Sequence, residues 1–453
     1  MSTLGRPAAP RAEQFPRNVL LRARWLLPVS GAPIEDAWIQ IRHGKICGFG
    51  RRKHPHGLGP TLDLGDAIVT SGFINAHTHL EFSACQQPFD ASGGLPQWID
   101  RVVRWRREAA TAAAASSSLT PLLAGLHESA AAGVVAVGDI ATAVPPAVDL
   151  PLLLHGPRLR IFRELLGLVP LPPGTASPAA PTVFRDAQRL SRAGIAVGLS
   201  PHAPYSTQWP LGRWAVAAAR RLHRQRPATR RPRPCIPLAM HLAESADEDQ
   251  FLHSQTGPFR TLFESLGVWP ARPPRLTSTA DWVSLLARAD RGLIVHGTHL
   301  PADAQAFARL RRHRSRLAVA FCPRTTLALA GRLPPVDAFQ RAGIRICLGT
   351  DGRGSNPDLS IRHEAGTLIA AGLVTPTDAL RMITINAAWA LGFENCTGHV
   401  AAGRPADLVV LRPAVTTRDA AAATVAVFAP DTTVLATLRG GRLIAGQLDF
   451  SGA

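Results

Sequence analysis

Residues 71–83, SGFINAHTHLEFS, contain the stretch around which the rest of the chain is organised. The mostly apolar residues 73–76 are typical of a buried strand, and His77 and His79 follow them at its end. Side chains two residues apart on a strand point to the same side. The stretch therefore predicts a strand that offers two imidazoles to one metal ion. Two satisfied polar residues at a strand end are the alternative.

Seven further apolar segments follow this stretch, and each precedes a stretch of helical composition. They span Gly133–Asp139, Leu159–Leu165, Ile195–His202, Pro237–Glu244, Gly292–Gly297, Leu317–Pro323 and Ile344–Asp351. Eight strands that alternate with helices over roughly 300 residues predict an α/β fold, a (β/α)8 TIM-like barrel within residues 71–399. An open doubly wound sheet is the alternative, but no glycine-rich GxGxxG loop follows the first strand.

Both ends of the chain have a different pattern. Residues 18–70 form short alternating segments with Gly and Pro turns, and three segments near the other end repeat this style. These three are Ala406–Pro413, Ala423–Pro430 and Thr433–Gly446. Neither end has enough apolar residues for a core of its own. We therefore expect residues 18–70 and 400–450 to pair into one composite β domain, with the barrel inserted between its halves.

The composition is that of a globular protein that can bury a large core. Of the 453 residues, 46% are hydrophobic and 18% are charged. The sequence has no signal-peptide core and no apolar stretch of membrane-spanning length. Its six cysteines are scattered without a CxxC pair. We therefore expect a cytoplasmic protein that does not contact a membrane.

The formal net charge of +18 raises nucleic-acid binding as a different class of function. Arginines cluster in residues 220–233 and 309–316. Both clusters follow expected helices, and neither is interleaved with the aromatic side chains that stack on single strands. We therefore favour a solvated basic face over a nucleic-acid-binding protein with a non-catalytic barrel. The expected partner is a small molecule, and the role of the Arg-rich segment 220–233 stays open.

Reactive side chains stand at the ends of five of the eight expected strands. These ends carry His77 with His79, His202, His241 with Glu244, His296, and Asp351. In a barrel of this kind the carboxyl ends of the strands hold the working residues. The chain has 16 histidines, so one histidine at a strand end carries little weight. The joint placement, however, predicts a metal site.

Imidazole and carboxylate groups suit one divalent ion, for which Zn²⁺ is favoured over Fe²⁺. The expected ligands are His77, His79, His241 and Asp351. Such an ion lowers the pKa of a bound water molecule to about 7, and Asp351 is placed to take the released proton. Glu244 follows His241 by three residues, so we expect the chain to turn there. Glu244 would then lie beside the metal as a proton shuttle.

Other interpretations stay open for several of these residues. His202 lies between two prolines and could be structural in a rigid turn, and His296 could be a buried histidine that bonds to the backbone. Arg163 and Glu164, at the end of the third expected strand, either bind a polar substrate group or form an ion pair that closes the barrel mouth. The only two lysines precede the first histidine pair, which excludes a catalytic lysine deeper in the chain.

Several motifs resemble, in order, the signatures of the amidohydrolase superfamily. They are NAHTHLE (75–81), SPHAPYS (200–206), MHLAES (240–245), IVHGTHL (294–300), LGTDGRGSNPDLS (348–360), TINAAWALG (384–392) and GHVAAGRPADLVVL (398–411). The resemblance is to the branch of cytosine deaminases, chlorohydrolases and adenosine-type deaminases. It implies a distorted (β/α)8 barrel with a composite β-sandwich domain and a mononuclear zinc or iron site. The absence of a lysine from the barrel fits this branch.

This resemblance implies a hydrolytic deaminase, in which a metal-bound hydroxide attacks the amino-bearing ring carbon of an aminated heterocycle. It further implies that His296 holds the attacking water and the tetrahedral intermediate, and that His202 contacts the substrate. The alternative within the same fold is an amidohydrolase that removes chloride or opens a cyclic amide.

The segment HTHLEFS, followed by LPQWIDRV (95–102), resembles the first loop of the aminodeoxyfutalosine deaminases. These enzymes of menaquinone biosynthesis hydrolyse a 6-aminopurine nucleoside to its hypoxanthine form. The resemblance implies that Glu81, Phe82 and Trp98 line the substrate pocket. One departure is CPRTT (322–326), where related deaminases have CPxSN, and this leaves the role of Arg324 open. A homodimer is among the assemblies that the sequence allows.

Overall fold

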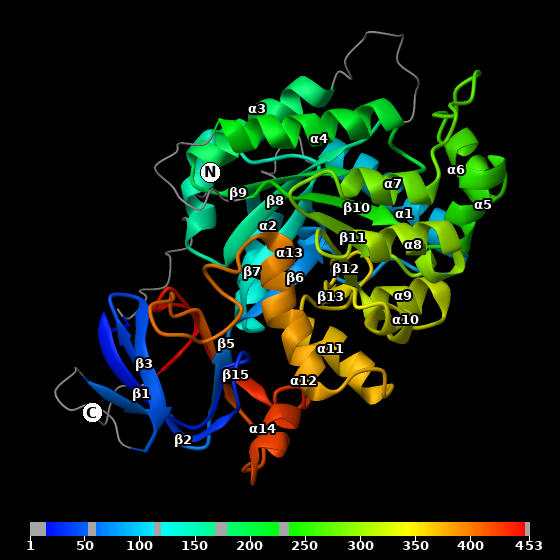
Figure 1. Ribbon diagram of the computed structural model, residues 1–453. Helices are drawn as coiled ribbons and strands as arrows, with labels where there is room; N and C mark the ends of the chain where they lie inside the picture. Colours follow the sequence, from blue (N-terminus) through cyan, green and yellow to red (C-terminus); the bar gives the residue numbers. More distant parts are fainter. Residues whose placement is uncertain (1–14, 53–59, 113–118, 168–178, 226–234, 449–453) are drawn as a thin grey trace.

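The structure is a computed structural model, and it describes residues 15–52, 60–112, 119–167, 179–225 and 235–448. Figure 1 shows a barrel of strands and helices and, beside it, a sheet-rich part to which both ends of the chain contribute. Within the described residues no helix is long and apolar enough to cross a membrane.

The barrel contains all eight strands that the sequence predicts. They are β6 (Phe73–Thr78), β7 (Val134–Ala141), β8 (Arg158–Leu165), β9 (Ala196–Pro201), β10 (Leu238–Leu242), β11 (Gly292–His296), β12 (Leu317–Phe321) and β13 (Arg345–Leu348). Each strand pairs in parallel with its neighbour in the chain. A parallel bridge between Thr78 and Asp351 joins the end of β6 to the segment after β13. The strands thus form the predicted (β/α)8 barrel, and their carboxyl ends meet at one face.

The helices cover the outside of the barrel. They are α1 (Leu95–Ala112), α2 (Leu119–Ala131), α3 (Ala179–Arg192), α4 (Trp209–Arg224), α5 (Ala246–Ser254), α6 (Pro258–Ser265), α7 (Thr279–Leu286), α8 (Ala304–Arg312), α9 (Pro323–Ala330), α10 (Val336–Arg341), α11 (Ile361–Ala370), α12 (Pro376–Arg381) and α13 (Ala387–Leu391). One large core cluster lies between strands and helices and includes Leu190 and Trp282. A second fills the barrel with side chains such as Phe162, Val295 and Ala320. The barrel is therefore filled by packed side chains below the face at which the carboxyl ends of the strands meet.

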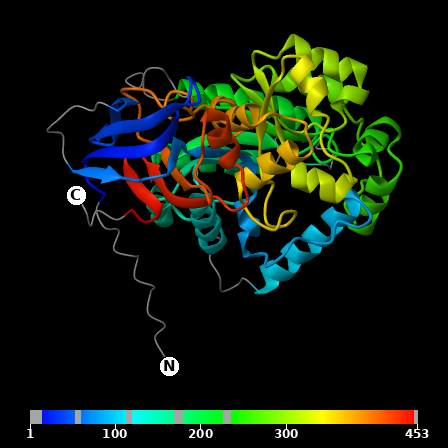
Figure 2. The same ribbon diagram turned by 90° about the horizontal axis from the view of Figure 1, so that it is seen from below.

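The two ends of the chain form one sheet. Its strands are β1 (Asn18–Leu27), β2 (Ile34–Arg42), β3 (Lys45–Arg51), β4 (Thr61–Asp63), β5 (Ile68–Ser71), β14 (Leu408–Arg412), β15 (Thr433–Arg439) and β16 (Arg442–Gly446). The order is β16-β15-β14-β5-β1-β2-β3, and β4 also pairs with β1. The antiparallel pair β5–β14 joins the two ends of the chain. Figure 2 shows the blue and red strands side by side. The predicted composite β domain is therefore present.

One of the three predictions of a strand near the C-terminal end is wrong. Residues 423–430 do not form a strand, because helix α14 (Ala420–Ala426) occupies the first half of this region. The carboxylate of Asp419 accepts a hydrogen bond of 2.8 Å from the backbone N–H of Ala422 and so caps the helix. The alanines that follow Asp419 favour a helix more than the β-branched residues Thr424 and Val425 oppose it.

The sheet is fixed directly to the barrel. Strand β5 leads into β6 through the single residue Gly72, and a Cβ atom there would lie 2.1 Å from Val135. Only glycine fits this approach. On the other side, Arg158 of β8 donates to both carboxylate oxygens of Asp407, at 2.9 and 3.1 Å. The position of the sheet thus depends on the same strands that carry the barrel's catalytic face.

Candidate metal centre

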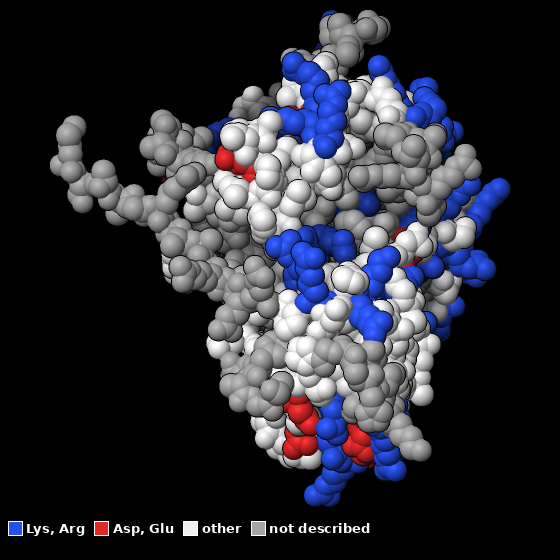
Figure 3. Space-filling view, turned by 90° about the vertical axis from the view of Figure 1, so that its left-hand side faces the viewer, with Lys and Arg blue, Asp and Glu red and all other residues white. Residues whose placement is uncertain are grey.

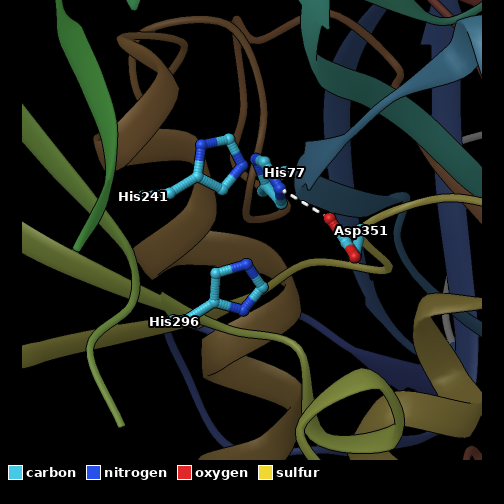
Figure 4. Close-up of side chains that lie close together, drawn as sticks. All are labelled: His77, His241, His296 and Asp351. Atoms are coloured by element: carbon cyan, nitrogen blue, oxygen red, sulfur yellow. Dashed lines mark hydrogen bonds and ion pairs between the residues drawn. The ribbon is translucent and has the colours of Figure 1, made fainter. Parts of the chain in front are cut away.

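Four side chains converge at the carboxyl ends of the barrel strands (Figure 4). They are His77 of β6, His296 of β11, His241 of β10 and Asp351, which follows β13. One potential ligand atom from each lies within 4.8 Å of all the others, and all four side chains are buried. Nε2 of His77 and Oδ1 of Asp351 are 3.1 Å apart. The barrel therefore brings three imidazoles and a carboxylate to one point.

His79 lies at the edge of this cluster. Its Nε2 atom is 3.2 Å from Nε2 of His241 and 3.7 Å from Oδ1 of Asp351. Burial lowers the pKa of both His79 and His241 well below the ordinary value of histidine. At neutral pH these rings are therefore neutral, which is the form that binds metals. All four predicted ligands lie together, and His296 lies with them.

The ligand-bearing side chains are oriented by hydrogen bonds from outside the cluster. Nδ1–H of His241 donates to the carbonyl oxygen of His202, at 3.1 Å, which leaves Nε2 of His241 free to bind a metal. The Oγ–H of Ser355 donates to Oδ2 of Asp351, at 2.5 Å. Burial alone would raise the pKa of Asp351, but the hydrogen bond from His77 and the nearby histidines lower it below its usual range. A buried set of imidazoles and one carboxylate fits a divalent ion.

The backbone at the cluster is held in an unusual conformation. Asp351, His296 and Ala243 all have positive φ angles, of 60°, 64° and 53°. Residues other than glycine adopt this region at a cost of order 1 kcal/mol or more each, and such residues concentrate at functional sites. The left-handed conformation occurs immediately after β10, at the last residue of β11 and three residues after the end of β13. The sequence contains no glycine at these positions that would have indicated it.

Glu244 lies beside the cluster, as predicted. Strand β10 ends at Leu242, and the chain turns at Ala243. Oε1 of Glu244 is then 3.4 Å from Nε2 of His296. Burial, with the charges of Asp351 and Glu248, raises the pKa of Glu244 well above its ordinary value. A raised pKa favours the protonated form, in which a carboxyl group can donate a proton.

Glu248 is a residue of the site that the sequence interpretation missed. Its buried carboxylate accepts hydrogen bonds from the backbone N–H groups of Ala243 and Glu244, at 3.0 and 2.9 Å. Glu248 therefore holds the turn that presents Glu244. The available signal was the capping box Ser245-x-x-Glu248. In the structure Ser245 does cap α5, but the Glu248 carboxylate reaches past it to the two preceding residues.

Glu81 and His202 border the cluster on another side. The carboxylate of Glu81 is bound by the guanidinium of Arg106 and accepts a hydrogen bond of 2.7 Å from Thr142. Nδ1 of His202 lies 2.5 Å from Oγ of Ser206, and the His202 ring centroid is 5.0 Å from that of His241. His202 thus has a partner within its own turn and also adjoins a predicted metal ligand.

The two charged residues near the end of β8 point to opposite sides. Glu164 lies on the interior side with Phe162, and its Oε1 is 3.9 Å from Nε2 of His202. Burial raises the pKa of Glu164 to about 7. Arg163 faces outward and binds Asp186 of α3, at 3.1 Å. The structure therefore does not bring Arg163 to the cluster, because alternation along the strand turns it toward the helices.

Trp98 and Arg324 lie at a cavity on the side of Asp351. The cavity has a volume of about 230 Å³, and Trp98, Arg324 and Ser355 contribute to its walls. The indole N–H of Trp98 donates to the carbonyl oxygen of Gly354, at 3.2 Å, so α1 is joined to the loop after β13. The guanidinium of Arg324 is bound by two carboxylates, of Asp358 and Glu364. Arg324 thus holds the same loop.

Comparisons with known proteins agree with this architecture. The model of the Amidohydrolase family matches residues 68–444. An aminodeoxyfutalosine deaminase of Deinococcus radiodurans is 31% identical over 329 residues, which cover 69% of this chain and 70% of the relative. A 5-methylthioadenosine/S-adenosylhomocysteine deaminase of Saccharophagus degradans is 28% identical over 435 residues, covering 87% of this chain and 83% of the relative.

Solved structures show the same fold. The aminofutalosine deaminase of Helicobacter pylori superposes with a TM-score of 0.75 at 20% identity, covering 94% of this chain and all of the other. A zinc-bound adenosine deaminase of Xanthomonas campestris has a TM-score of 0.68 at 22% identity, covering 95% and 93%. Because the family model spans most of the sequence, and a relative above 30% identity covers two thirds of it, the chain belongs to the amidohydrolase family.

Proposed function

We propose that this hydrolase of carbon–nitrogen bonds is a cytoplasmic, metal-dependent deaminase of a 6-aminopurine nucleoside. The observation that carries the proposal is the buried carboxyl group of Glu244, held 3.4 Å from His296 beside a buried cluster that could hold a metal ion. Relatives named as aminodeoxyfutalosine deaminase and as methylthioadenosine/S-adenosylhomocysteine deaminase support the substrate class. An aminodeoxyfutalosine-like substrate would place the enzyme in menaquinone biosynthesis.

The proposed ligands of the ion are His77, His79, His241 and Asp351, with Zn²⁺ favoured over Fe²⁺. When bound, the ion acts as a Lewis acid and lowers the pKa of a water molecule. His296 faces both the cluster and Glu244, so we place it against the attacking water. His202, Glu81 and Trp98 would contact the substrate around the reacting ring. We leave Arg163 out of the pocket because it binds Asp186.

The proposed reaction needs two carboxyl groups that transfer protons. The carboxylate of Asp351 is ionised before the reaction. It takes a proton from the attacking water while the water oxygen bonds to ring carbon 6. Glu244 gives its proton to ring nitrogen 1, which makes the ring carbon a better electrophile. The bond between carbon 6 and the amino nitrogen then breaks as Asp351 passes its proton to that nitrogen, and ammonia leaves. The hydroxyl group on carbon 6 gives its proton to Glu244 as it becomes the carbonyl group, which restores both carboxyl groups. The product is the 6-oxopurine nucleoside.

The purified protein is expected to carry close to one zinc, iron or manganese ion per chain and to release ammonia from adenosine-like nucleosides. Elemental analysis and an ammonia assay on a panel of such nucleosides check both expectations. Protein without any of these metals would overturn the metal-dependent mechanism. Activity on cytosine, or on a chlorinated triazine, with none on the panel would instead support the alternative amidohydrolase of the same fold.

The distribution of charge fits a small-molecule substrate better than a nucleic acid. Figure 3 shows basic side chains in several separate groups on one face, with acidic ones beside the group at its lower end. Several N-terminal arginines are paired, as Arg51 is with Glu35 at 3.1 Å. In the Arg-rich segment 220–233, residues 220–224 form the last part of α4, and Gln225 caps it. Residues 226–233 lie outside the described residues. A homodimer stays a prediction.

Replacing Glu248 with glutamine is expected to lower kcat about tenfold and to leave KM and metal content nearly unchanged. An amide offers one acceptor oxygen where the carboxylate offers two, so one of the two backbone N–H groups loses its bond and Glu244 is less well placed. Steady-state kinetics and elemental analysis measure the effect. Glu264→Gln on α6 is the matched control, because Glu264 is exposed and pairs with Arg260 on the same helix. Metal loss in Glu248→Gln would contradict a positioning role.

A further inference from the structure

The two carboxylate oxygens of Asp351 have different surroundings. Oδ1 faces the histidines, at 3.1 Å from Nε2 of His77 and 3.7 Å from Nε2 of His79. Oδ2 accepts a hydrogen bond of 2.5 Å from the hydroxyl group of Ser355. The last torsion of an aspartate side chain is soft, so a carboxylate with no partner on its second oxygen can turn away from the cluster. The bond from Ser355 therefore fixes the orientation of the Asp351 carboxylate.

A second hydroxyl group holds that of Ser355. It belongs to Thr325, in the first turn of α9, and its Oγ1 lies 2.9 Å from Oγ of Ser355. Because the Ser355 hydroxyl donates its one hydrogen to Asp351, it accepts the hydrogen of Thr325. The carbonyl oxygen of Gly352, the other acceptor near the Ser355 hydroxyl, is farther away, at 3.4 Å. Thr325 and Ser355, called the hydroxyl pair below, thus form a directed chain of hydrogen bonds that ends on Asp351.

Buried polar groups support the hydroxyl pair from behind. Nδ2 of Asn356 lies 3.3 Å from Oγ1 of Thr325 and donates to Oε1 of Glu364, at 2.9 Å. Glu364 also accepts from the backbone N–H and the Nε–H of Arg324, at 2.9 and 2.7 Å. Thr325, Asn356 and Glu364 are completely buried. The motif CPRTT (322–326) therefore contributes both a hydroxyl of the pair and the arginine that binds its support.

We propose that the hydroxyl pair positions the carboxylate of Asp351, both as a metal ligand and as the group that takes the water proton. The second of these roles rests on the proposed deaminase function, whereas the first rests only on the metal-binding cluster. Hydrogen bonds to a ligand from outside the cluster typically change metal affinity or activity by about 10- to 100-fold. The alternative is that Ser355 only closes its own turn, in which its backbone N–H donates to the Gly352 carbonyl at 3.1 Å. Thr325 would then have no influence on the site.

Two substitutions at position 325 separate the hydroxyl group from the shape of the side chain. Valine has the shape of threonine without the hydroxyl, and serine keeps the hydroxyl without the methyl group. For the zinc-loaded full chain we expect Thr325→Val to lower kcat about tenfold at nearly constant KM, and Thr325→Ser to stay within about threefold of the unchanged enzyme. The control is Thr367→Val, because the Thr367 hydroxyl donates to the carbonyl oxygen of His363 on the same helix. An active Thr325→Val beside an impaired Thr325→Ser would show that position 325 supplies packing, and would overturn the proposal.

The zinc dissociation constant, measured by competition with a chelator, gives a readout that does not depend on deamination. Ser355→Ala is expected to raise this constant about 10- to 100-fold, and Thr325→Val by a smaller factor. The double variant should be no worse than Ser355→Ala, since Thr325 acts through Ser355. Fully additive effects, or unchanged zinc affinity and kcat in Ser355→Ala, would overturn the proposal. If the unchanged enzyme holds zinc but deaminates no nucleoside, the proposed function fails, and the zinc measurements still decide whether the hydroxyl pair positions Asp351 as a ligand.

Discussion

The substitution Asp351→Ala is expected to remove the bound metal and to lower kcat at least about 1,000-fold. Asp351 supplies the carboxylate of the cluster, and its Oδ1 lies 3.1 Å from His77 and 3.7 Å from His79. Without it the remaining donors are neutral imidazoles, which bind a divalent ion less tightly, and the group that takes the water proton is also lost. Elemental analysis and the ammonia assay, on enzyme purified without added metal, measure the two losses.

The control for Asp351→Ala is Asp337→Ala, which removes an exposed carboxylate of α10. This control should keep metal and activity. Circular dichroism should show that both variants fold, because Asp351 lies after β13 and its side chain contacts only the site and Ser355 within the described residues. Full metal occupancy in Asp351→Ala would contradict the assignment of Asp351 as a ligand.

Glutamine at position 244 is expected to leave the metal in place and to lower kcat by about 100- to 10,000-fold. The amide has nearly the shape of the carboxyl group but cannot exchange a proton with the ring nitrogen or with the hydroxyl group on carbon 6. Metal content should stay unchanged, since the carboxyl group of Glu244 is placed against His296 and outside the four grouped ligand atoms. Single-turnover kinetics, together with metal analysis, separates the chemical step from binding.

Glu264→Gln, an exposed substitution on α6, controls for the change of charge. It should retain full activity. Loss of metal from Glu244→Gln would show that Glu244 is a ligand and not a proton shuttle. An unchanged kcat would show that another group donates the proton, and Glu164 would then be the next candidate because burial also raises its pKa, to about 7.

The barrel could be predicted from the sequence because its strands are short apolar runs with turn signals on either side. Buried parallel strands require such runs, and each of the eight segments corresponds to one strand. The helix α14 was missed because Thr424, Val425 and Val427 are typical of strands. The start of the helix depends on one hydrogen bond, which the backbone N–H of Ala422 donates to the carboxylate of Asp419. Residue preferences along the chain do not reveal this contact.

The ligand residues could be predicted because strand ends meet at one face of a barrel, whatever the details of packing. The roles of Glu248 and Arg324 could not be predicted from the sequence, because each acts through hydrogen bonds to residues on either side of a turn. Arg163 shows the same limit in another way. Its neighbour Glu164 points into the barrel, and only the register of β8 decides which of the two side chains faces the site.

The pairing of β5 with β14 has a consequence for how the protein is made. A ribosome completes β1, β5 and the eight barrel strands before residues 408–412 exist, so one edge of β5 has no partner strand until β14 is made. Because only Gly72 separates β5 from β6, this unpaired edge lies next to the histidine-bearing strand while the barrel assembles. Completion of the sheet, by the pairing of β14 with β5, is therefore a late event of folding.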